Sequence, residues 1–307
     1  MLINQMPATV AGLLYQHIGR TFFVAPSASY TIGGRTYTAS DGNDGLSPDK
    51  ALLTVAQAQT LVTASAGDAV FLLPGAHTVA ASIAASKAGV TYTGPARGRG
   101  KIFGGQASIT TSADDEIMNV TAADIEICHL TVIPVTTKAG INFSAAATRL
   151  HVHDCYFDMA TAAVNTGTIG LDATGAAQYL LVEDCYFLSD GAQGPALELT
   201  AVIDSVIRGC YITANAGTWA VAVQLGAATE NVIFDRCRWS TSGTAISSGI
   251  DGTGATIGSG VTVCDCRFTS LVTVPVEDFD AAEAELVESY KGGIGATDGG
   301  ALIVAIT

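Results

Sequence analysis

Apolar and polar residues alternate along short segments of this chain, and the alternation returns at a nearly constant distance. The clearest segments share one pattern: apolar, any residue, apolar, any residue, a turn residue, Cys, any residue, and then an aromatic residue or Ile. Five copies occur, at residues 150–157, 180–187, 205–212, 232–239 and 261–268. Their cysteines, Cys155, Cys185, Cys210, Cys237 and Cys266, are separated by 30, 25, 27 and 29 residues. A repeat of this length is typical of proteins built from stacked structural units.

The phase of the alternation changes inside each copy. Leu150 and Val152 are expected to point inward, and the next inward residue is Cys155. Two short strands joined by a one-residue bend at Asp154 explain this change, because side chains alternate between the two faces along a strand. A sixth copy at 124–132 has Leu130 in place of the Cys. The bend position in the other copies holds His129, Asp184, Gly209, Arg236 and Asp265. Asp and Gly accept left-handed backbone readily, whereas Arg is a poor fit.

A third alternating segment lies about nine residues before each strand pair, at residues 140–143, 169–172, 196–199, 220–225 and 248–251. Each repeat therefore holds three short strands and is too short for a β-α-β unit, which needs about 30 or more residues including a helix. The pattern predicts an all-β fold, a single right-handed parallel β-helix in which coil stacks on coil. The cysteines and the aromatic residues are then expected to form ladders inside it, because a small thiol packs well beside aromatic rings.

Both ends of such a stack expose unpaired backbone and core side chains, so both ends need a cap. Residues 48–64 are predicted to form an N-terminal capping helix, signalled by Ser47 and Pro48. Segments 67–79 and 89–94 are expected to supply the first strands. Residues 278–293 are predicted to form a C-terminal amphipathic helix that is followed by a strand-like end.

These expectations divide the chain into three parts. Residues 1–40 form an N-terminal attachment arm and a first strand. Residues 41–270 form the β-helix with its capping helix, and residues 271–307 form a C-terminal cap or an oligomer-contact tail. The arm either attaches to a partner or lays an extra strand over the first rungs.

Charge and composition exclude several classes of function. The chain has 28 acidic and 14 basic residues and a formal net charge of −14, so it would repel a phosphate backbone, and no nucleic-acid partner is expected. It has no run of 18 apolar residues and no basic residue before its short apolar start, so we expect neither membrane insertion nor a secretory signal. Seven cysteines in such a chain indicate synthesis in a reducing cytoplasm, where they remain thiols.

Residues 39–58, followed by the Gly-Asp start and the Pro-Gly turn of residues 65–79, resemble the opening of pectin-lyase-like right-handed β-helices. That family includes many bacteriophage tailspike-like and virion-surface proteins. The resemblance extends over about residues 21–270. It implies a fold more than an activity, because this fold hosts lyases, hydrolases, adhesins and structural spikes.

For a polysaccharide lyase, the resemblance would imply calcium-binding carboxylates beside an Arg or Lys base on an outward strand. The cluster that fits best is Asp154, Glu183, Asp184, Arg208 and Asp235. Asp154 and Asp184 belong to neighbouring rungs about 4.8 Å apart, a distance that suits a retaining carboxylate pair. The same spacing arises in any such solenoid, and Asp also fits the bend. A structural role is therefore preferred, and none of these residues is assigned as catalytic.

Two aromatic residues, Tyr211 and Trp219, are candidates for stacking on a sugar ring or for lining a subunit interface, whereas Trp239 belongs to the row of core aromatics. His151 and His153 flank the carboxylates, but no motif supplies them with a nucleophile, so we interpret them as surface histidines.

No metal site and no cofactor are predicted. A metal site needs ligands that converge with suitable spacing, and only Cys264 and Cys266, on opposite faces of a strand bend, suggest one. Packing of the cysteines inside the solenoid is the preferred interpretation. Residues 41–45 superficially suggest a calcium loop, but they lack its closing Glu and the oxygen ligands between.

Successive coils differ by only a few residues and therefore lack the long insertions that usually wall a catalytic cleft. The first hypothesis is a structural bacteriophage virion protein, made in the host cytoplasm: a capsid decoration, a head spike or a short tail spike. Its N-terminal region would attach to capsid or tail proteins, it would form a homotrimer, and its surface could contact host glycans. The alternative is a polysaccharide depolymerase, a lyase or glycosidase, that acts on host surface polysaccharide. A secreted adhesin is a weaker third interpretation.

Overall fold

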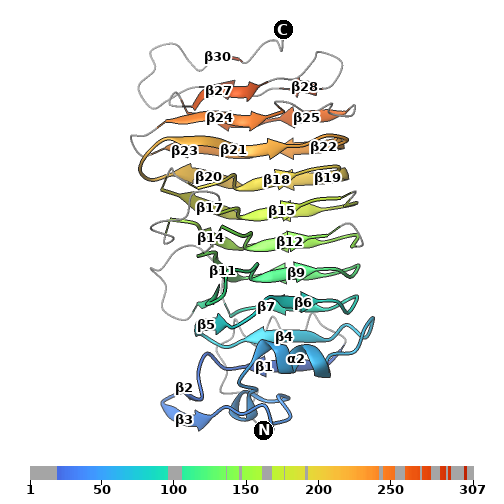
Figure 1. Cartoon of the computed structure of the whole chain (residues 1–307), viewed down its shortest axis with the longest axis vertical. Coiled ribbons are helices and arrows are strands. Elements are labelled where there is room, and N and C mark those ends of the chain that lie inside the picture. Colours follow the sequence, from blue (N-terminus) through green and yellow to red (C-terminus); the bar gives the residue numbers. More distant parts are fainter. Residues whose placement is uncertain are drawn as a thin grey trace.

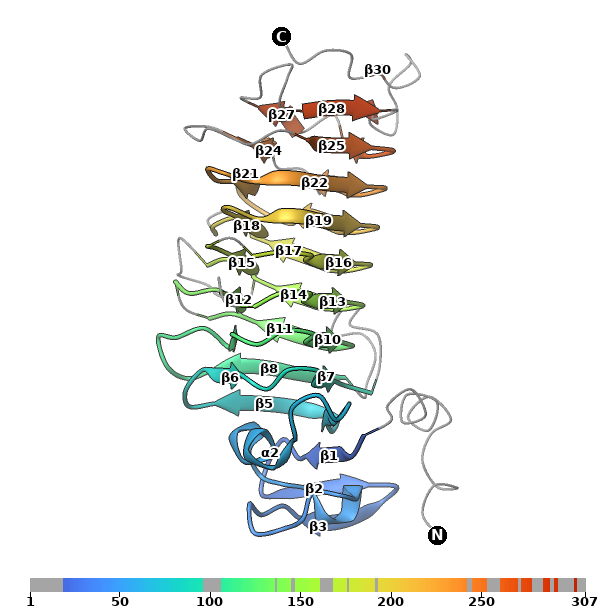
Figure 2. The ribbon, with the colours of Figure 1, turned by 90° about the vertical axis from the view of Figure 1, so that its right-hand side faces the viewer.

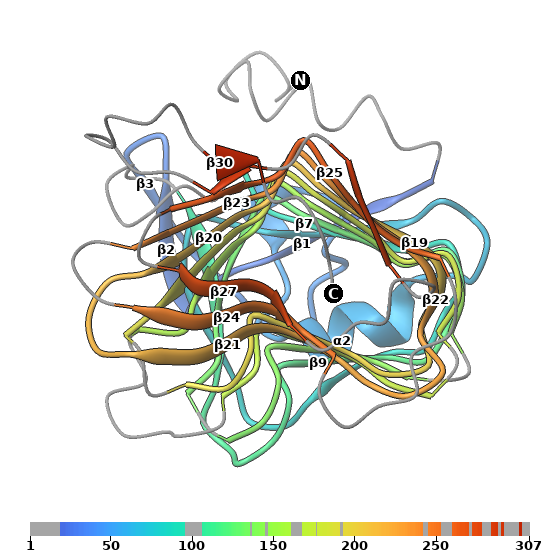
Figure 3. The same cartoon turned by 90° about the horizontal axis from the view of Figure 1, so that it is seen from above.

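The computed structural model describes residues 19–95, 106–135, 137–144, 147–160, 168–175, 177–190, 193–241, 245–252, 260–269, 272–277, 284–287, 290–291 and 301–302. Short strands stack in regular rungs along one axis (Figure 1). Seen along that axis, three sheets enclose a common interior (Figure 3). The predicted fold class, an all-β parallel β-helix, is confirmed.

The three sheets run the length of the solenoid, and we number them in the order of their first strands. Sheet 1 has the order β1 (Thr21–Val24), β4 (Ala69–Leu72), β7 (Thr91–Thr93), β10 (Glu126–Cys128), β13 (His151–His153), β16 (Leu181–Glu183), β19 (Ile203–Arg208), β22 (Glu230–Asp235), β25 (Val261–Cys264) and β28 (Ala284–Val287). Sheet 2 has the order β5 (Gly75–Val79), β8 (Ala107–Thr111), β11 (Leu130–Ile133), β14 (Tyr156–Asp158), β17 (Tyr186–Ser189), β20 (Tyr211–Ala214), β23 (Arg238–Thr241), β26 (Arg267–Phe268), β29 (Tyr290–Lys291) and the antiparallel β30 (Ala301–Leu302). Sheet 3 has the order β6 (Ile83–Ala85), β9 (Met118–Val120), β12 (Ile141–Phe143), β15 (Leu171–Ala173), β18 (Leu197–Leu199), β21 (Trp219–Leu225), β24 (Ile246–Asp251) and β27 (Val272–Glu277).

A single residue in left-handed backbone joins sheet 1 to sheet 2 in the six predicted coils. The residues with this conformation are His129, Asp154, Asp184, Gly209, Arg236 and Asp265, with φ between 49° and 63°. The predicted bend is therefore confirmed even at Arg236, where φ is 52°. The stacked coils hold this residue in place, because its backbone N–H donates to the carbonyl of Cys264 at 3.0 Å.

A second left-handed column, which the sequence did not reveal, lies five residues earlier in each coil. Its members are Asp124, Arg149, Tyr179, Asp204, Asn231 and Gly260, with φ between 51° and 89°. Asp, Asn and Gly accept this conformation readily, but Arg149 and Tyr179 are unusual in it and interrupt the pattern in the sequence. The column turns each coil into sheet 1.

The cysteine and aromatic ladders lie inside the solenoid as predicted. The five cysteines are free thiols, and none is more than 1% exposed. The Cys155 thiol donates to the backbone carbonyl of Ile127 on the preceding rung at 3.6 Å, and the higher cysteines repeat this contact. Phe157 stacks on Phe187 with ring centroids 4.5 Å apart. Trp239 is buried and stacks on Phe268 at 4.4 Å, as expected of a core residue.

The N-terminal end of the solenoid is closed by a hairpin, β2 (Ser29–Ile32) and β3 (Arg35–Thr38), and by the short helices η2 (Pro48–Lys50) and α2 (Val55–Leu61) (Figure 2). The capping helix is shorter than predicted. Between η2 and α2 the chain pairs with β1, since the Leu52 N–H donates to the carbonyl of Phe23 at 2.8 Å. This pairing uses backbone that a continuous helix would need, so α2 begins only after Thr54.

Strand β1 adds a parallel strand to sheet 1 beside β4. Residues 1–18 lie outside the described part of the chain, so the attachment role of the arm stays a prediction.

The helix predicted at 278–293 is wrong where the structure describes this segment. Residues Ala284–Val287 form β28, which pairs in parallel with β25, and Tyr290–Lys291 form β29, which pairs with β26. The segment continues the coils because the last rung offers unpaired backbone groups that a strand satisfies and a helix does not.

Candidate functional site

The predicted carboxylate cluster lies on the outward face of sheet 1. The strand register places Cys128, His153, Glu183, Arg208, Asp235 and Cys264 in one row that crosses the rungs. Glu126 and His151 are partners in the neighbouring row. Three of the five candidates therefore share a row, while Asp154 and Asp184 occupy the bend beside it.

Glu183 is kept ionised by a hydrogen bond from His151 and an ion pair with Arg208. His151 Nε2 donates to Glu183 Oε2 at 2.9 Å, and the Arg208 guanidinium forms an ion pair with Glu183 Oε1. Partial burial acts to raise the pKa of Glu183, but Arg208 and His151 outweigh it and hold the pKa below its usual value. Glu183 is therefore unsuited to donate a proton near neutral pH.

His153 lies at the centre of the cluster between two carboxylates. Its Nε2 contacts Glu126 Oε1 at 3.0 Å, and its Nδ1 contacts Asp154 Oδ2 at 3.2 Å. Burial acts to lower the pKa of His153, but hydrogen bonds to Cys128, Glu126 and Asp154 raise it to about 11. The ring of His151 stacks on that of His153 at 4.3 Å, and burial followed by the charge of His153 lowers its pKa.

The two remaining candidates, Asp235 and Asp184, lie among groups that explain their positions in the solenoid without a catalytic role. Asp235 forms an ion pair with Arg236, with Oδ2 and Nη2 3.0 Å apart. Asp184 lies in the bend, and its Oδ1 would be only 2.6 Å from a side-chain Cβ at Gly209. A Gly at that bend therefore leaves room for the carboxylate on the rung below.

The prediction that Trp219 contacts a sugar or a subunit is wrong. Its side chain is fully buried, and its Nε1 donates to the carbonyl of Gly194 at 3.0 Å. The register pairs Trp219 with Ile246 inside the solenoid, so its ring is part of the core.

Tyr211 is placed where it can meet a ligand. It is half-buried on the outward face of sheet 2 and continues a stack of tyrosines, with centroids 5.2 Å apart for Tyr156 and Tyr186 and 5.0 Å apart for Tyr186 and Tyr211. The guanidinium of Arg238 lies 5.8 Å from the centroid of the Tyr211 ring. The predicted sugar or subunit contact of Tyr211 remains a prediction.

A second polar row, which the sequence analysis missed, follows the outward face of sheet 3. The register aligns six amide and carboxylate side chains: Asn119, Asn142, Asp172, Glu198, Gln224 and Asp251. The signal was present, because each of the third alternating segments carries one amide or carboxylate at its outward position.

Asp172 is the most perturbed carboxyl group of this row. Burial, followed by the negative charges of Glu198 and Glu116, raises its pKa to about 6. Among the described residues, no group donates a hydrogen bond to the buried oxygens Asn119 Oδ1, Asn142 Oδ1 or Asp172 Oδ1. Buried acceptors almost always have a partner, so these oxygens indicate a place for water or a ligand. A carboxyl group with a pKa of about 6 beside Glu198 is also an arrangement suited to acid–base chemistry.

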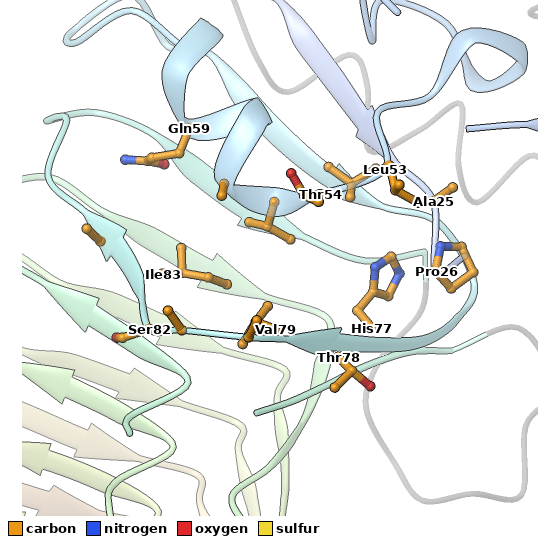
Figure 4. Close-up of a pocket in the computed structure, with 16 residues that line it drawn as sticks. Ala25, Pro26, Leu53, Thr54, Gln59, His77, Thr78, Val79, Ser82 and Ile83 are labelled. Atoms are coloured by element: carbon orange, nitrogen blue, oxygen red, sulfur yellow. The ribbon is translucent and has the colours of Figure 1, made fainter. Parts of the chain in front are cut away.

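A cavity of about 460 Å³ lies beside the capping helix, bordered by α2, β5 and β6 (Figure 4). Its lining is largely apolar. His77 lies there with Nε2 2.8 Å from the carbonyl of Leu73, and burial lowers its pKa. No carboxylate is among the lining residues, so the cavity lacks a partner for acid–base work.

One group of side chains on sheet 1 could hold a metal ion. It consists of Glu126, Cys128 and His153, whose candidate ligand atoms all lie within 4.8 Å of one another.

In the described part of the chain, none of the helices is long and apolar enough to cross a membrane.

Comparison with known proteins gives similarity at the level of structure. No protein-family model and no curated protein sequence matches this chain. A pectin methylesterase variant solved with a hexasaccharide has a TM-score of 0.57 and 11% identity over 86% of this chain and 92% of its own. A pectin methylesterase from Erwinia chrysanthemi has a TM-score of 0.57 and 10% identity, with 90% and 91% covered. One from Aspergillus niger has a TM-score of 0.52 and 12% identity, with 81% and 85% covered. The chain therefore shares the pectin-lyase-like right-handed parallel β-helix fold of these enzymes.

Proposed function

We propose that this protein is a bacteriophage virion-surface protein whose β-helix binds a host polysaccharide along the outward face of sheet 3. The observation that carries the proposal is the row of six amide and carboxylate side chains on consecutive rungs. Three neighbouring rungs in this row, those of Asn119, Asn142 and Asp172, have buried oxygens without a donor among the described residues.

The row has the chemistry that a sugar chain needs. Amides offer both donors and acceptors, carboxylates offer acceptors, and sugar hydroxyls act as both. The polar groups repeat with the strand spacing, about 4.8 Å, along one line. The carboxylates of Asp172, Glu198 and Asp251 would repel a polyanion, and the formal net charge of −14 acts in the same direction. We therefore expect an uncharged or amine-bearing polysaccharide.

Binding can be tested with purified capsular polysaccharide and lipopolysaccharide from candidate hosts, measured by calorimetry. Asn142→Ala and Glu198→Ala are expected to weaken binding at least ~10-fold, since each removes a hydrogen-bonding group from a half-buried surface. Arg267→Ala, an exposed position on sheet 2, is the matched control and should bind as the unaltered protein does. Equal affinity of all three variants would exclude the sheet 3 row as the binding face.

The virion location rests on the resemblance of residues 39–79 to β-helices of virion-surface proteins and on a rigid stack suited to a spike or decoration. Attachment through the N-terminal region to capsid or tail proteins, and a homotrimeric state, belong to the same proposal. Mass spectrometry of purified phage particles should detect the protein in stoichiometric amounts, and its absence from particles would refute the location. Light scattering tests the trimer, and a stable monomer would refute it.

A second candidate, a polysaccharide depolymerase, is favoured by one observation, the raised pKa of Asp172 beside Glu198. Asp172 would protonate the departing glycosidic oxygen, and Glu198 would attack the anomeric carbon. Water would then release the sugar from Glu198. Incubation with the same polysaccharides, followed by assays for new reducing ends and for unsaturated uronate, separates the two candidates. Turnover that is lost in Asp172→Asn and Glu198→Gln would establish the enzyme, whereas binding without turnover supports the structural role.

A further inference from the structure

The outward face of sheet 1 brings three different metal-ligating side chains together from two strands. Glu126 and Cys128 are alternate residues of β10 on the same face, since Ile127 between them is fully buried. His153 lies on β13 directly beside Cys128 in the register. Their candidate ligand atoms, a carboxylate oxygen, a sulfur and a ring nitrogen, all lie within 4.8 Å of one another.

Asp154 and Thr91, which are not candidate ligands, hold His153 and Glu126 in position. His153 presents Nε2 to Glu126 Oε1 at 3.0 Å, while its Nδ1 donates to Asp154 Oδ2 at 3.2 Å. A histidine fixed by a carboxylate through its second ring nitrogen is the usual arrangement around protein-bound metals. The hydroxyl of Thr91 donates to Glu126 Oε2 at 2.8 Å and so fixes the carboxylate.

The cluster is enclosed on one side and open on the other. Cys128 is 3% exposed, and its thiol donates to Thr93 Oγ1 at 3.2 Å. The side chains of Glu126 and His153 are 35% and 19% exposed, so an ion can enter from solvent. A partly buried thiolate, imidazole and carboxylate together form a mixed sulfur, nitrogen and oxygen ligand set.

We propose that Glu126, Cys128 and His153 bind a divalent transition-metal ion of the zinc class. Thiolate and imidazole favour such an ion over calcium or magnesium, which prefer oxygen ligands. Three protein ligands leave a fourth tetrahedral position for water or for a ligand atom. Binding releases the protons of Cys128 and His153 to solvent. This site is independent of the polysaccharide face, because it lies on sheet 1.

The row itself supplies a matched control. Cys264 occupies the same row as Cys128, several rungs higher, and is half-buried whereas Cys128 is buried. Its Sγ faces Asp235 Oδ1 at 3.8 Å, and the four described histidines, His77, His129, His151 and His153, include none on β22 or β25. A thiol that binds metal merely because it lies beside a carboxylate would therefore bind equally well at both positions.

The test uses the full chain after treatment with a chelator. Zn²⁺ is titrated in competition with a chromophoric chelator, and Co²⁺ is added separately to look for thiolate-to-cobalt charge-transfer absorption. We expect one ion per chain and a charge-transfer band. Cys128→Ser should abolish the band and weaken Zn²⁺ binding at least ~10-fold, and Asp154→Asn should weaken it by about 10- to 100-fold. Cys264→Ser should change neither measurement.

Circular dichroism and thermal unfolding of each variant without metal establish that the fold is retained, and Glu126→Gln provides a milder change if Cys128→Ser is unstable. Saturating Zn²⁺ should raise the Tm of the unaltered protein and of Cys264→Ser but not that of Cys128→Ser. Substoichiometric binding by the unaltered protein, or unchanged affinity in a folded Cys128→Ser or Glu126→Gln variant, would overturn the proposal.

Discussion

Asp172 on β15 and Glu198 on β18 are direct register partners on adjacent strands of sheet 3, so two carboxyl groups face the same side one rung apart. Burial and this proximity make it costly to ionise both, and the pKa of Asp172 rises to about 6. The two carboxyl groups meet only because two successive coils stack, so the raised pKa of Asp172 is a property of the folded state.

Because the pKa of Asp172 is raised from 3.8 to about 6, the folded state holds this proton more tightly than the unfolded state does. Its effect on stability is therefore a loss that develops as pH rises from about 4 and is complete above about pH 7. Asp172→Asn should be more stable than the unaltered protein at pH 7.5, by about 1 kcal/mol once solvent screening of this half-exposed group is included. The difference should shrink towards pH 4. Urea unfolding across this pH range measures it, and a gain that is independent of pH would contradict the assignment.

Phe187 tests the internal aromatic ladder. It is fully buried and stacks on Phe157 at an interplanar angle of 11°. Phe187→Ala should lower the free energy of unfolding by about 3–5 kcal/mol, because the stacked coils cannot collapse into the space that is left. Leu53→Ala, at a position that is 38% exposed, should cost less than about 1 kcal/mol. Similar losses for the two variants in chemical denaturation would argue against a rigid ladder.

Arg236 tests the left-handed bend. With φ at 52°, Arg236 adopts a conformation that glycine accepts without steric cost. Arg236→Gly should stabilise the protein by up to about 1 kcal/mol, reduced by the loss of an exposed ion pair with Asp235. Arg238→Gly, two residues later in β23, should instead destabilise it, because glycine weakens a strand. Thermal unfolding of both variants checks the opposite signs, and a loss of stability in both would refute the strain at position 236.

Thr54 tests the start of the capping helix. Its Oγ1 accepts from the Gln57 N–H at 3.1 Å and donates to Asp41 Oδ2 at 2.9 Å. Thr54→Ala should cost about 1–2 kcal/mol, since it removes the N-cap and one further hydrogen bond. Thr60→Ala, inside α2, serves as the control and should be close to neutral, because alanine is the better helix former. If Ser47→Ala had the larger effect, the helix would begin where the sequence predicted it.

The sequence alone determined the features that depend on local alternation. The period of the cysteines, the inward faces of Leu150 and Val152, and the bend at Asp154 follow from which residues can share a strand face or a left-handed backbone. These features were enough to predict a three-strand coil and a ladder of buried thiols. The same reasoning also placed Trp239 in the core.

Only the tertiary structure decided which outward side chains meet. Coils separated by 25 to 30 residues must stack before Cys128 lies beside His153 or Asp172 beside Glu198, and loops of unequal length conceal that register in the sequence. Stacking also directed Trp219 inward and drew Ala284–Val287 into a strand, because the edge of the last rung needs hydrogen-bond partners. A residue's type fixes the chemistry it can perform, but its partners are set by the register between coils.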